Sequence, residues 1–118
     1  QVNEAYQTLK DPVRRACYLL SLRGIDAMDE KNTAMPADFL MEQLEWREAL
    51  ENARALENGE HLEAMHDELA QMLRSLGNTF AAALAGDHLE TATTLARKMR
   101  FVQKLGEETE RALAEMDA

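Results

Sequence analysis

The stretch "LEAMHDELAQMLRSLGNTFAAAL", residues 62–84, decides the predicted fold. Its large apolar residues recur in alternating steps of three and four, which is the spacing of a helix face packed against other helices. No stretch of the sequence alternates with the period of two that a strand requires, so we predict an all-α protein. The residues of this face are Leu62, Met65, Leu69, Met72 and Leu76, continued by Phe80 and Leu84.

Two further long helices are predicted, one on either side of this stretch. The first runs from about residue 38 to 57, the other follows Gly86, and the connections between the helices are short. Because short connections make neighbouring long helices run antiparallel, residues 37–118 are predicted to form an antiparallel three-helix bundle. The turn and cap signals are Asn58 and Gly59 after the first helix, and the capping pair Asp87 and Glu90 before the last.

A short helix pair is predicted ahead of the bundle, in residues 1–24. Asp11 can cap its second helix, and Pro12 can take the first position, where a missing N–H costs nothing. Gly24 supplies a stop, and residues 25–36, which are rich in turn-forming residues, are predicted to be a linker. The chain begins inside a helical pattern rather than at a methionine, so we expect its natural N-terminus to lie upstream.

The predicted helix at residues 38–57 carries apolar side chains on two faces. At about 100° of rotation per residue, one of these faces suits the core of the bundle. This predicted core face consists of Phe39, Trp46, Leu50 and Ala53, with Ala49 and Leu56 at its edge.

The second apolar face consists of Leu40, Met41 and Leu44, followed by the carboxylates of Glu45 and Glu48. Left in water, each of the three apolar side chains forgoes the roughly 1.5–3 kcal/mol that full burial supplies. A contiguous exposed patch of this kind marks a contact surface in many proteins. Two readings stay open: either the face binds a partner, or the preceding helix pair packs over it.

A similar ambiguity surrounds Phe101 in the stretch "ARKMRFVQKL", residues 96–105. The ring lies off the apolar stripe of its helix, with Arg97, Arg100 and Lys104 near it in the helical projection. The sequence leaves two interpretations, a partner anchor or an edge-of-core ring with basic side chains folded over it.

Composition limits the possible functions. The chain has 118 residues, of which 46% are hydrophobic, enough for one modest core. Its formal net charge of -9 repels nucleic acid and anionic membrane surfaces, so neither is an expected partner. No apolar run approaches the roughly 20 residues of a membrane span, and no signal-peptide pattern is present. With one cysteine, the chain fits a reducing compartment, and we expect a cytoplasmic protein.

Catalytic and metal-binding motifs find no support in the sequence. His61 and His66 lie five residues apart, a spacing that places the two imidazoles on poorly matched helix faces. Cys17 is most simply a small buried side chain. The chain shows no glycine-rich phosphate loop and no nucleophile motif. We therefore expect a protein that is not an enzyme and that has no metal or cofactor of its own.

Parts of the sequence resemble a known family. The stretch "VNEAYQTLKDPVRRACYLLSLRG", residues 2–24, is similar to the end of a J domain, and its Tyr18-Leu19-Leu20 portion resembles the iron-sulfur co-chaperones of the HscB or Jac type. "DFLMEQLEWRE", residues 38–48, and "ARKMRFVQKL" resemble two blocks of that family's C-terminal domain. The likeness covers the whole chain in register.

The resemblance implies a J domain, of which residues 1–24 are the last part, joined to a three-helix domain at residues 37–118 that binds the cluster scaffold IscU. Such proteins bring IscU to the chaperone HscA and stimulate its ATPase. The family's His-Pro-Asp loop and the zinc-binding extension of some eukaryotic members are absent from this sequence, so we expect scaffold binding without chaperone stimulation. One acidic family position falls at Asn52. The family's scaffold-binding surface falls on Leu40, Met41, Leu44, Glu45, Glu48 and Phe101.

An alternative of a different class is a small helical self-association module, in which the face containing Leu40, Met41 and Leu44 meets its own copy across a two-fold axis. The scaffold-binding reading expects a monomeric, bacterial cytoplasmic protein instead.

Overall fold

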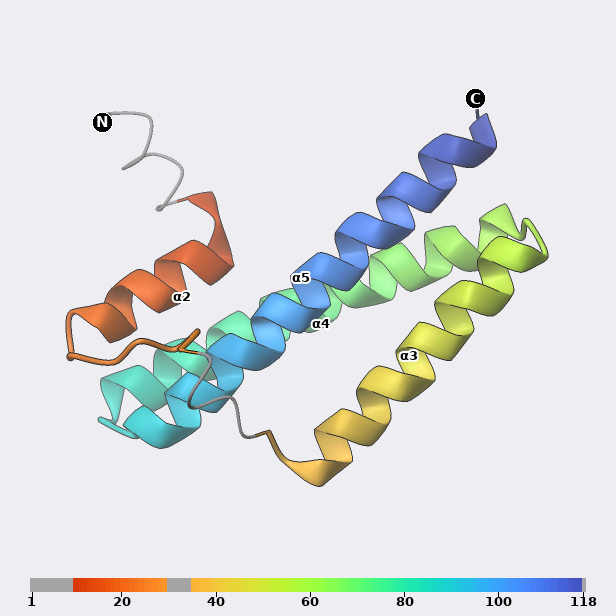
Figure 1. The fold of residues 1–118 in the computed structure, drawn as a ribbon. Helices are drawn as coiled ribbons and strands as arrows, with labels where there is room; N and C mark the ends of the chain where they lie inside the picture. The colour runs from red at the N-terminus through yellow and green to blue at the C-terminus, as the bar shows by residue number, and fades with distance from the viewer. Residues whose placement is uncertain (1–9, 30–34, 118) are drawn as a thin grey trace. The chain divides into compact units, whose positions relative to one another are not determined.

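A computed structural model of the chain describes residues 10–29 and 35–117, and all regular elements in these ranges are helices (Figure 1). The prediction of an all-α fold is therefore confirmed. The helix predicted at the start of the chain lies in residues 1–9, outside the described ranges. The helices are α2 at Pro12–Ser21, α3 at Ala37–Ala55, α4 at Gly59–Ala85 and α5 at Leu89–Asp117.

Contacts divide the chain into two compact units. The first, here called the α2 unit, consists of Gln1–Thr33 and Leu73–Arg100. The second, the α3 unit, consists of Ala34–Met72 and Phe101–Ala118. Helices α4 and α5 therefore contribute one portion to each unit. The predicted division into residues 1–24, 25–36 and 37–118 follows the order of the sequence and stays a prediction.

Helix α2 begins as its sequence predicts. The Asp11 side chain accepts hydrogen bonds from the backbone N–H groups of Val13 at 2.9 Å and Arg14 at 3.0 Å, while Pro12 occupies the first helical position. These bonds satisfy donors that have no partner inside the helix. Gly24 follows the helix with a φ of 77°, a conformation that glycine adopts without steric cost.

The core of the α2 unit forms between α2 and the portions of α4 and α5 in the same unit. The segment after α2 also belongs to it: Ala27 is buried, and Ile25 and Met28 pack against the cluster. The Arg97 guanidinium donates from Nε to the Ala27 carbonyl at 2.8 Å. Residues 25–28 of the predicted linker therefore pack against a core. The buried members of the cluster are Val13, Ala16, Leu20, Ala27, Phe80, Ala83, Ala92, Leu95, Ala96 and Met99.

In the α3 unit, the buried face of α3 matches the predicted core face only in part. Phe39, Leu50 and Ala53 are buried, but Trp46 is only half-buried and Leu56 is 77% exposed. The prediction for Leu56 is wrong: Leu56 is the C-cap residue that follows α3, still with a helical backbone conformation, and its side chain faces solvent. The buried partners from α4 and α5 are Leu62, Met65, Leu69, Val102, Leu105, Thr109 and Ala112.

The turn between α3 and α4 corrects the predicted boundary. Glu57, not Gly59, adopts the left-handed conformation that reverses the chain, with a φ of 51°. The Asn58 N–H donates to the Ala53 carbonyl at 3.0 Å, which closes α3. The Asn58 side chain then accepts from the His61 N–H at 3.1 Å, and Gly59 is the first residue of α4. Asn58 therefore caps the start of α4, a position that asparagine favours, and Gly59 opens the helix although glycine more often follows a helix end.

The turn between α4 and α5 repeats this hydrogen-bond pattern. Asp87 has a φ of 60°, and the His88 N–H donates to the Ala83 carbonyl at 2.8 Å. The spacing between Asp87 and Glu90 predicted that Asp87 is the N-cap of α5. This prediction is wrong. The Asp87 carboxylate instead forms an ion pair with Arg23 at 2.6 Å. A left-handed residue at the end of α4 cannot also provide the extended backbone of an N-cap.

Candidate protein-binding surface

Three large apolar side chains on the N-terminal half of α3 face solvent. Leu40 is 48% exposed, and Met41 and Leu44 are each 60% exposed. Spacings of three and four residues make them neighbours on the helix surface. We call these three residues the α3 patch. The opposite side of α3 is buried through Phe39 and Leu50, so the helix has an apolar face in the core and another in water.

Glu45 and Glu48 continue the strip that the α3 patch begins, and both are exposed. They lie one helical turn beyond Met41 and Leu44, respectively, on the same surface of the helix. The surface therefore combines an apolar centre with a negatively charged margin. Such a combination suits a partner whose contact residues are apolar and whose surrounding charges are positive.

Phe101 is half-buried at the edge of the core in the α3 unit. Its ring meets that of Phe39 edge to face, with centroids 5.6 Å apart and planes at 85°. The Arg47 guanidinium lies over the same ring, 5.7 Å from its centroid. Edge-to-face and cation–π geometries are both attractive, so the orientation of Phe101 is well determined from two sides.

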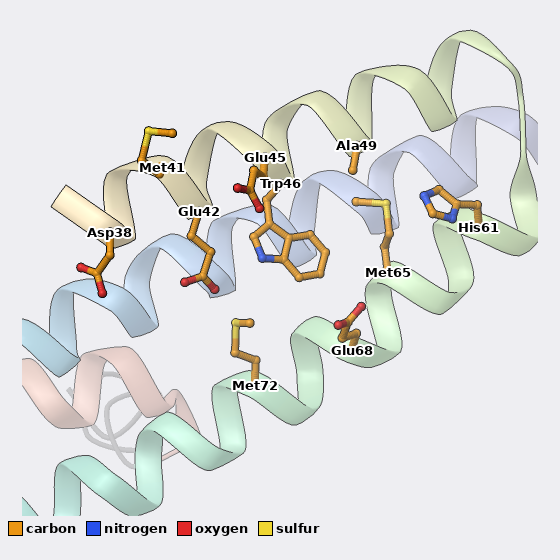
Figure 2. Close-up of a pocket in the computed structure, with 10 residues that line it drawn as sticks. All are labelled: Asp38, Met41, Glu42, Glu45, Trp46, Ala49, His61, Met65, Glu68 and Met72. Atoms are coloured by element: carbon orange, nitrogen blue, oxygen red, sulfur yellow. The ribbon is translucent and has the colours of Figure 1, made fainter. Parts of the chain in front are cut away.

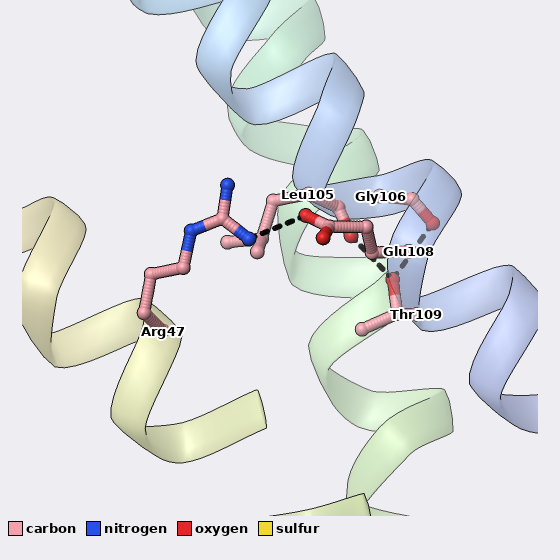
Figure 3. A network of polar contacts seen from close by, with 5 residues as sticks. All are labelled: Arg47, Leu105, Gly106, Glu108 and Thr109. Carbon is pink, nitrogen blue, oxygen red and sulfur yellow. Dashed lines mark hydrogen bonds and ion pairs between the residues drawn. The ribbon is translucent and has the colours of Figure 1, made fainter. Parts of the chain in front are cut away.

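The cation over Phe101 comes from α3 and not from the predicted cluster on α5. Arg47 also pairs with Glu108 at 2.6 Å (Figure 3). Arg97, which the sequence placed near the ring, donates to the Ala27 carbonyl instead. No pattern in the sequence joins Arg47 to Phe101, because the two residues are distant along the chain and meet only after folding.

The segment of α5 that carries Glu108 is also held from within. Thr109 is fully buried, and its hydroxyl donates to the carbonyls of Gly106 at 2.7 Å and Leu105 at 3.1 Å (Figure 3). These bonds satisfy a polar group that would otherwise be costly to bury. Glu108, which pairs with Arg47, therefore lies in a turn of α5 whose one buried hydroxyl, that of Thr109, has hydrogen-bond partners.

A groove of about 660 Å³ lies between α3 and α4 within the α3 unit. Trp46 projects from α3 toward α4, where Met65, Glu68 and Met72 lie (Figure 2). We call this feature the α3–α4 groove. Four of its apolar residues, Trp46, Ala49, Met65 and Met72, were predicted to belong to the core or its edge, because helical periodicity cannot separate a buried seam from one that is partly open. Met41 lines the groove and also belongs to the α3 patch.

The histidines and the cysteine show no catalytic arrangement. His66 Nε2 lies 3.7 Å from Glu110, whereas His61 is exposed and lines the groove. Burial raises the pKa of the Cys17 thiol, with Arg100 acting in the opposite direction, so the reactive thiolate is disfavoured. In the described ranges, no three histidine, cysteine or acidic side chains gather as a metal site, and no helix is long and apolar enough to cross a membrane.

Comparisons with known proteins place these features in a family. Residues 35–110 match the family model described as the HSCB C-terminal oligomerisation domain. The "Co-chaperone protein HscB homolog" of Ralstonia nicotianae is 45% identical over 121 residues, an alignment that covers 99% of this chain and 67% of the relative. The protein of the same name from an Azoarcus species is 44% identical over 119 residues, with coverage of 99% and 67%.

A solved structure agrees with this assignment. The chaperone HscB from Vibrio cholerae matches with a TM-score of 0.82 and 41% sequence identity, covering 98% of this chain and 69% of that one. The family model, the relatives and the fold all agree with the likeness carried by residues 2–24, 38–48 and 96–105. The chain belongs to the HscB family of co-chaperone proteins.

Proposed function

We propose that the chain acts in iron-sulfur cluster biogenesis by binding a scaffold protein of the IscU type through the α3 patch. Glu45 and Glu48 form the charged margin of the contact, and Phe101 lies at its edge. The protein then delivers the scaffold to a chaperone of the HscA type in the bacterial cytoplasm. Membership of the HscB family supports the co-chaperone role, and the exposed residues of α3 support this choice of surface.

The exposure of the α3 patch carries the proposal. Three adjacent apolar side chains that are 48–60% exposed leave a contiguous surface that a partner can cover. Covering each one supplies part of the roughly 1.5–3 kcal/mol expected for full burial of such a side chain. Large residues at the centre of an interface dominate binding energy, so a small patch can hold most of the affinity.

Phe101 adds a ring of fixed orientation at the edge of the proposed scaffold-binding surface. Phe39 and Arg47 already hold its ring, so little side-chain entropy remains to be lost when a partner touches it. Arg47 is drawn toward Glu108, which keeps the cation over the ring. Replacing Arg47 by alanine would therefore loosen Phe101 without removing any residue of the α3 patch.

Calorimetry against an apo IscU-type scaffold tests the proposal. Leu40→Ala and Leu44→Ala should each weaken binding by about 2 kcal/mol, as expected for central anchors. Leu56→Ala is the matched control, because Leu56 is equally large and even more exposed but lies beyond the end of α3. If all three substitutions weakened scaffold binding equally, or if none of them weakened it, the α3 patch would not be part of the interface.

The proposal also separates binding from chaperone stimulation. The sequence contains no His-Pro-Asp tripeptide, the element of a J domain that acts on the chaperone ATPase. We therefore expect this chain to bind the scaffold without accelerating HscA, and in excess to suppress stimulation by an intact HscB protein. A steady-state ATPase assay with HscA and scaffold measures both effects. Acceleration by this chain alone, beyond that caused by the scaffold, would contradict the expectation.

Self-association is a second candidate, because the matching family model is described as an oligomerisation domain. In that case the α3 patch would meet its own copy across a two-fold axis. Sedimentation of the isolated chain at two concentrations distinguishes the candidates. Scaffold binding expects a monomer at both, whereas self-association expects a concentration-dependent mass that Leu44→Ala lowers and Leu56→Ala leaves unchanged.

A further inference from the structure

The α3–α4 groove has a different chemistry from the α3 patch. Its floor and walls include the indole of Trp46 and the thioethers of Met65 and Met72 (Figure 2). Methionine side chains are flexible and polarizable, so they adapt to apolar partners of varied shape. Tryptophan combines a large apolar surface with an N–H donor and is enriched among residues that dominate interfaces. The lining is therefore suited to an apolar side-chain stripe.

The charge of the groove has one sign. Four of its lining residues are carboxylates, and none of the lining residues that the structure describes is a lysine or an arginine. An apolar channel bordered by four carboxylates and one histidine, His61, favours a partner that carries positive charge beside its apolar residues. The four carboxylates are Asp38, Glu42, Glu45 and Glu68.

The dimensions suit a helix. The lining residues extend from Asp38 to Ala49 on α3 and from His61 to Met72 on α4. At 1.5 Å per residue, each of these stretches measures about 16 Å, the length of about three helical turns. An amphipathic helix of that length can lay its apolar face along such a channel.

We propose that the α3–α4 groove binds a basic amphipathic helix of a partner protein. The apolar stripe of that helix lies on Trp46 and Met72, above a floor that the buried Met65 forms, and its lysine or arginine side chains meet the carboxylates along the borders. A second copy of this chain fits poorly, because its formal net charge of -9 repels the groove. Peptide binding in the groove does not require scaffold binding, but the two surfaces adjoin: Met41 and Glu45 are common to both, whereas Leu40 and Leu44 do not line the groove.

Trp46 is the only tryptophan of the chain, so its fluorescence reports directly on this groove. The probe is a capped synthetic peptide of about 14 leucine and lysine residues, with leucine at helical positions i, i+3, i+4 and i+7. Control peptides have the same composition in scrambled order, or glutamate in place of lysine. We expect a saturable blue shift of Trp46 emission with the patterned peptide, binding about tenfold weaker with the scrambled one, and no shift with the glutamate peptide.

Paired substitutions locate the binding. Glu42→Lys with Glu68→Lys reverses charge in the groove, whereas Glu51→Lys with Glu63→Lys makes the same change of net charge at exposed carboxylates of the same helices outside it. The first pair should weaken binding by about tenfold and the second by less than about threefold. Circular dichroism checks that both variants remain helical.

Several outcomes would overturn the proposal. Equal weakening by the two pairs, or equal binding of the patterned and scrambled peptides, would reduce the effect to net charge. Loss of peptide binding in Leu40→Ala with Leu44→Ala would move the site to the α3 patch. An emission shift that depends on the concentration of the chain alone, before any peptide is added, would make a second copy the occupant.

Discussion

In each unit, one helix packs against portions of α4 and α5, and the exposed surfaces of these two helices, α2 and α3, differ in chemistry. In the α2 unit, the helix that covers α4 and α5 buries Val13, Ala16 and Leu20 and exposes basic residues such as Arg14 and Arg15. In the α3 unit, the covering helix also buries one face, but it exposes the apolar α3 patch and a series of carboxylates. The formal net charge of -9 is a sum over the whole chain, so it does not show that the exposed charged side chains of α2 are basic whereas most of those of α3 are acidic.

The comparison shows that a covering helix with two apolar faces can contribute to a core with one face and offer the other to a partner. Leu50 and Leu44 belong to the same helix, yet one is 1% exposed and the other 60%. The first residue contributes to folding, and the second is available to a partner. In α2, Leu20 is fully buried and Tyr18 is exposed, and the exposed Leu22, which caps the end of the helix, is followed by Arg23.

The largest expected effect tests the two faces directly. Leu50→Ala and Leu20→Ala should each lower the free energy of unfolding by about 2–5 kcal/mol, because each leaves a cavity among buried side chains. Leu44→Ala, at an exposed position of α3, and Leu22→Ala, at the exposed C-cap position of α2, should change it by less than about 0.5 kcal/mol. Urea unfolding followed by circular dichroism measures all four. If Leu44→Ala destabilised the chain as much as Leu50→Ala, the α3 patch would be a structural contact.

The turns that follow α3 and α4 allow a second comparison, because both place an acidic residue at positive φ. Glu57→Gly should raise the free energy of unfolding by about 1 kcal/mol, since glycine tolerates the left-handed conformation. Asp87→Gly should gain less, because it also removes the exposed ion pair with Arg23, worth about 0–1 kcal/mol. Thermal unfolding of the two variants gives the difference. An equal gain from the two substitutions would mean that the ion pair contributes nothing to stability.

The charged margin of the α3 patch should affect rates more than equilibrium. Exposed carboxylates steer an oppositely charged partner toward the surface, so Glu45→Gln with Glu48→Gln should slow association with the scaffold several-fold. Dissociation should change less, and added salt should slow the unsubstituted chain in the same way. Stopped-flow mixing resolves the two rates. An on-rate indifferent to both salt and substitution would exclude these carboxylates from the encounter.

The smallest expected effect concerns Cys17 in the α2 unit. Burial raises the pKa of its thiol, so at pH values near the ordinary thiol pKa of about 8.5 the folded chain holds its proton more tightly than the unfolded chain. Stability relative to Cys17→Ala should therefore be constant below that pH and decline as the pH rises through the shifted pKa. Alkylation should also be slower in the folded chain than in urea. Equal alkylation rates would show that burial does not protect the thiol.

Local rules account for much of the fold. The steps of three and four in residues 62–84 specify α4, and Asp11 with Pro12 specifies the start of α2, because periodicity and capping depend only on residues a few positions apart. The same rules place Leu40, Met41 and Leu44 together and away from Leu50, since rotation along a helix is fixed by its geometry. The two-sided character of α3 is therefore visible in its sequence, and the exposure of its outer face is visible only in the structure.

Tertiary structure decided the features that join distant residues. Arg47 lies over Phe101 and pairs with Glu108, although the sequence pointed to cations on α5. Trp46 borders an open groove, although its position in the helical repeat matches the core face of α3. Whether that face is covered depends on side chains of α4, which are not its neighbours in the sequence. Residues 25–28, which read as a linker, pack in the α2 unit because Ala27 and its neighbours meet apolar side chains from α4 and α5. Sequence alone determined which side chains share a helix face, since that depends on neighbours along the chain; the fold decided which faces are covered, since that depends on residues distant in sequence and adjacent in space.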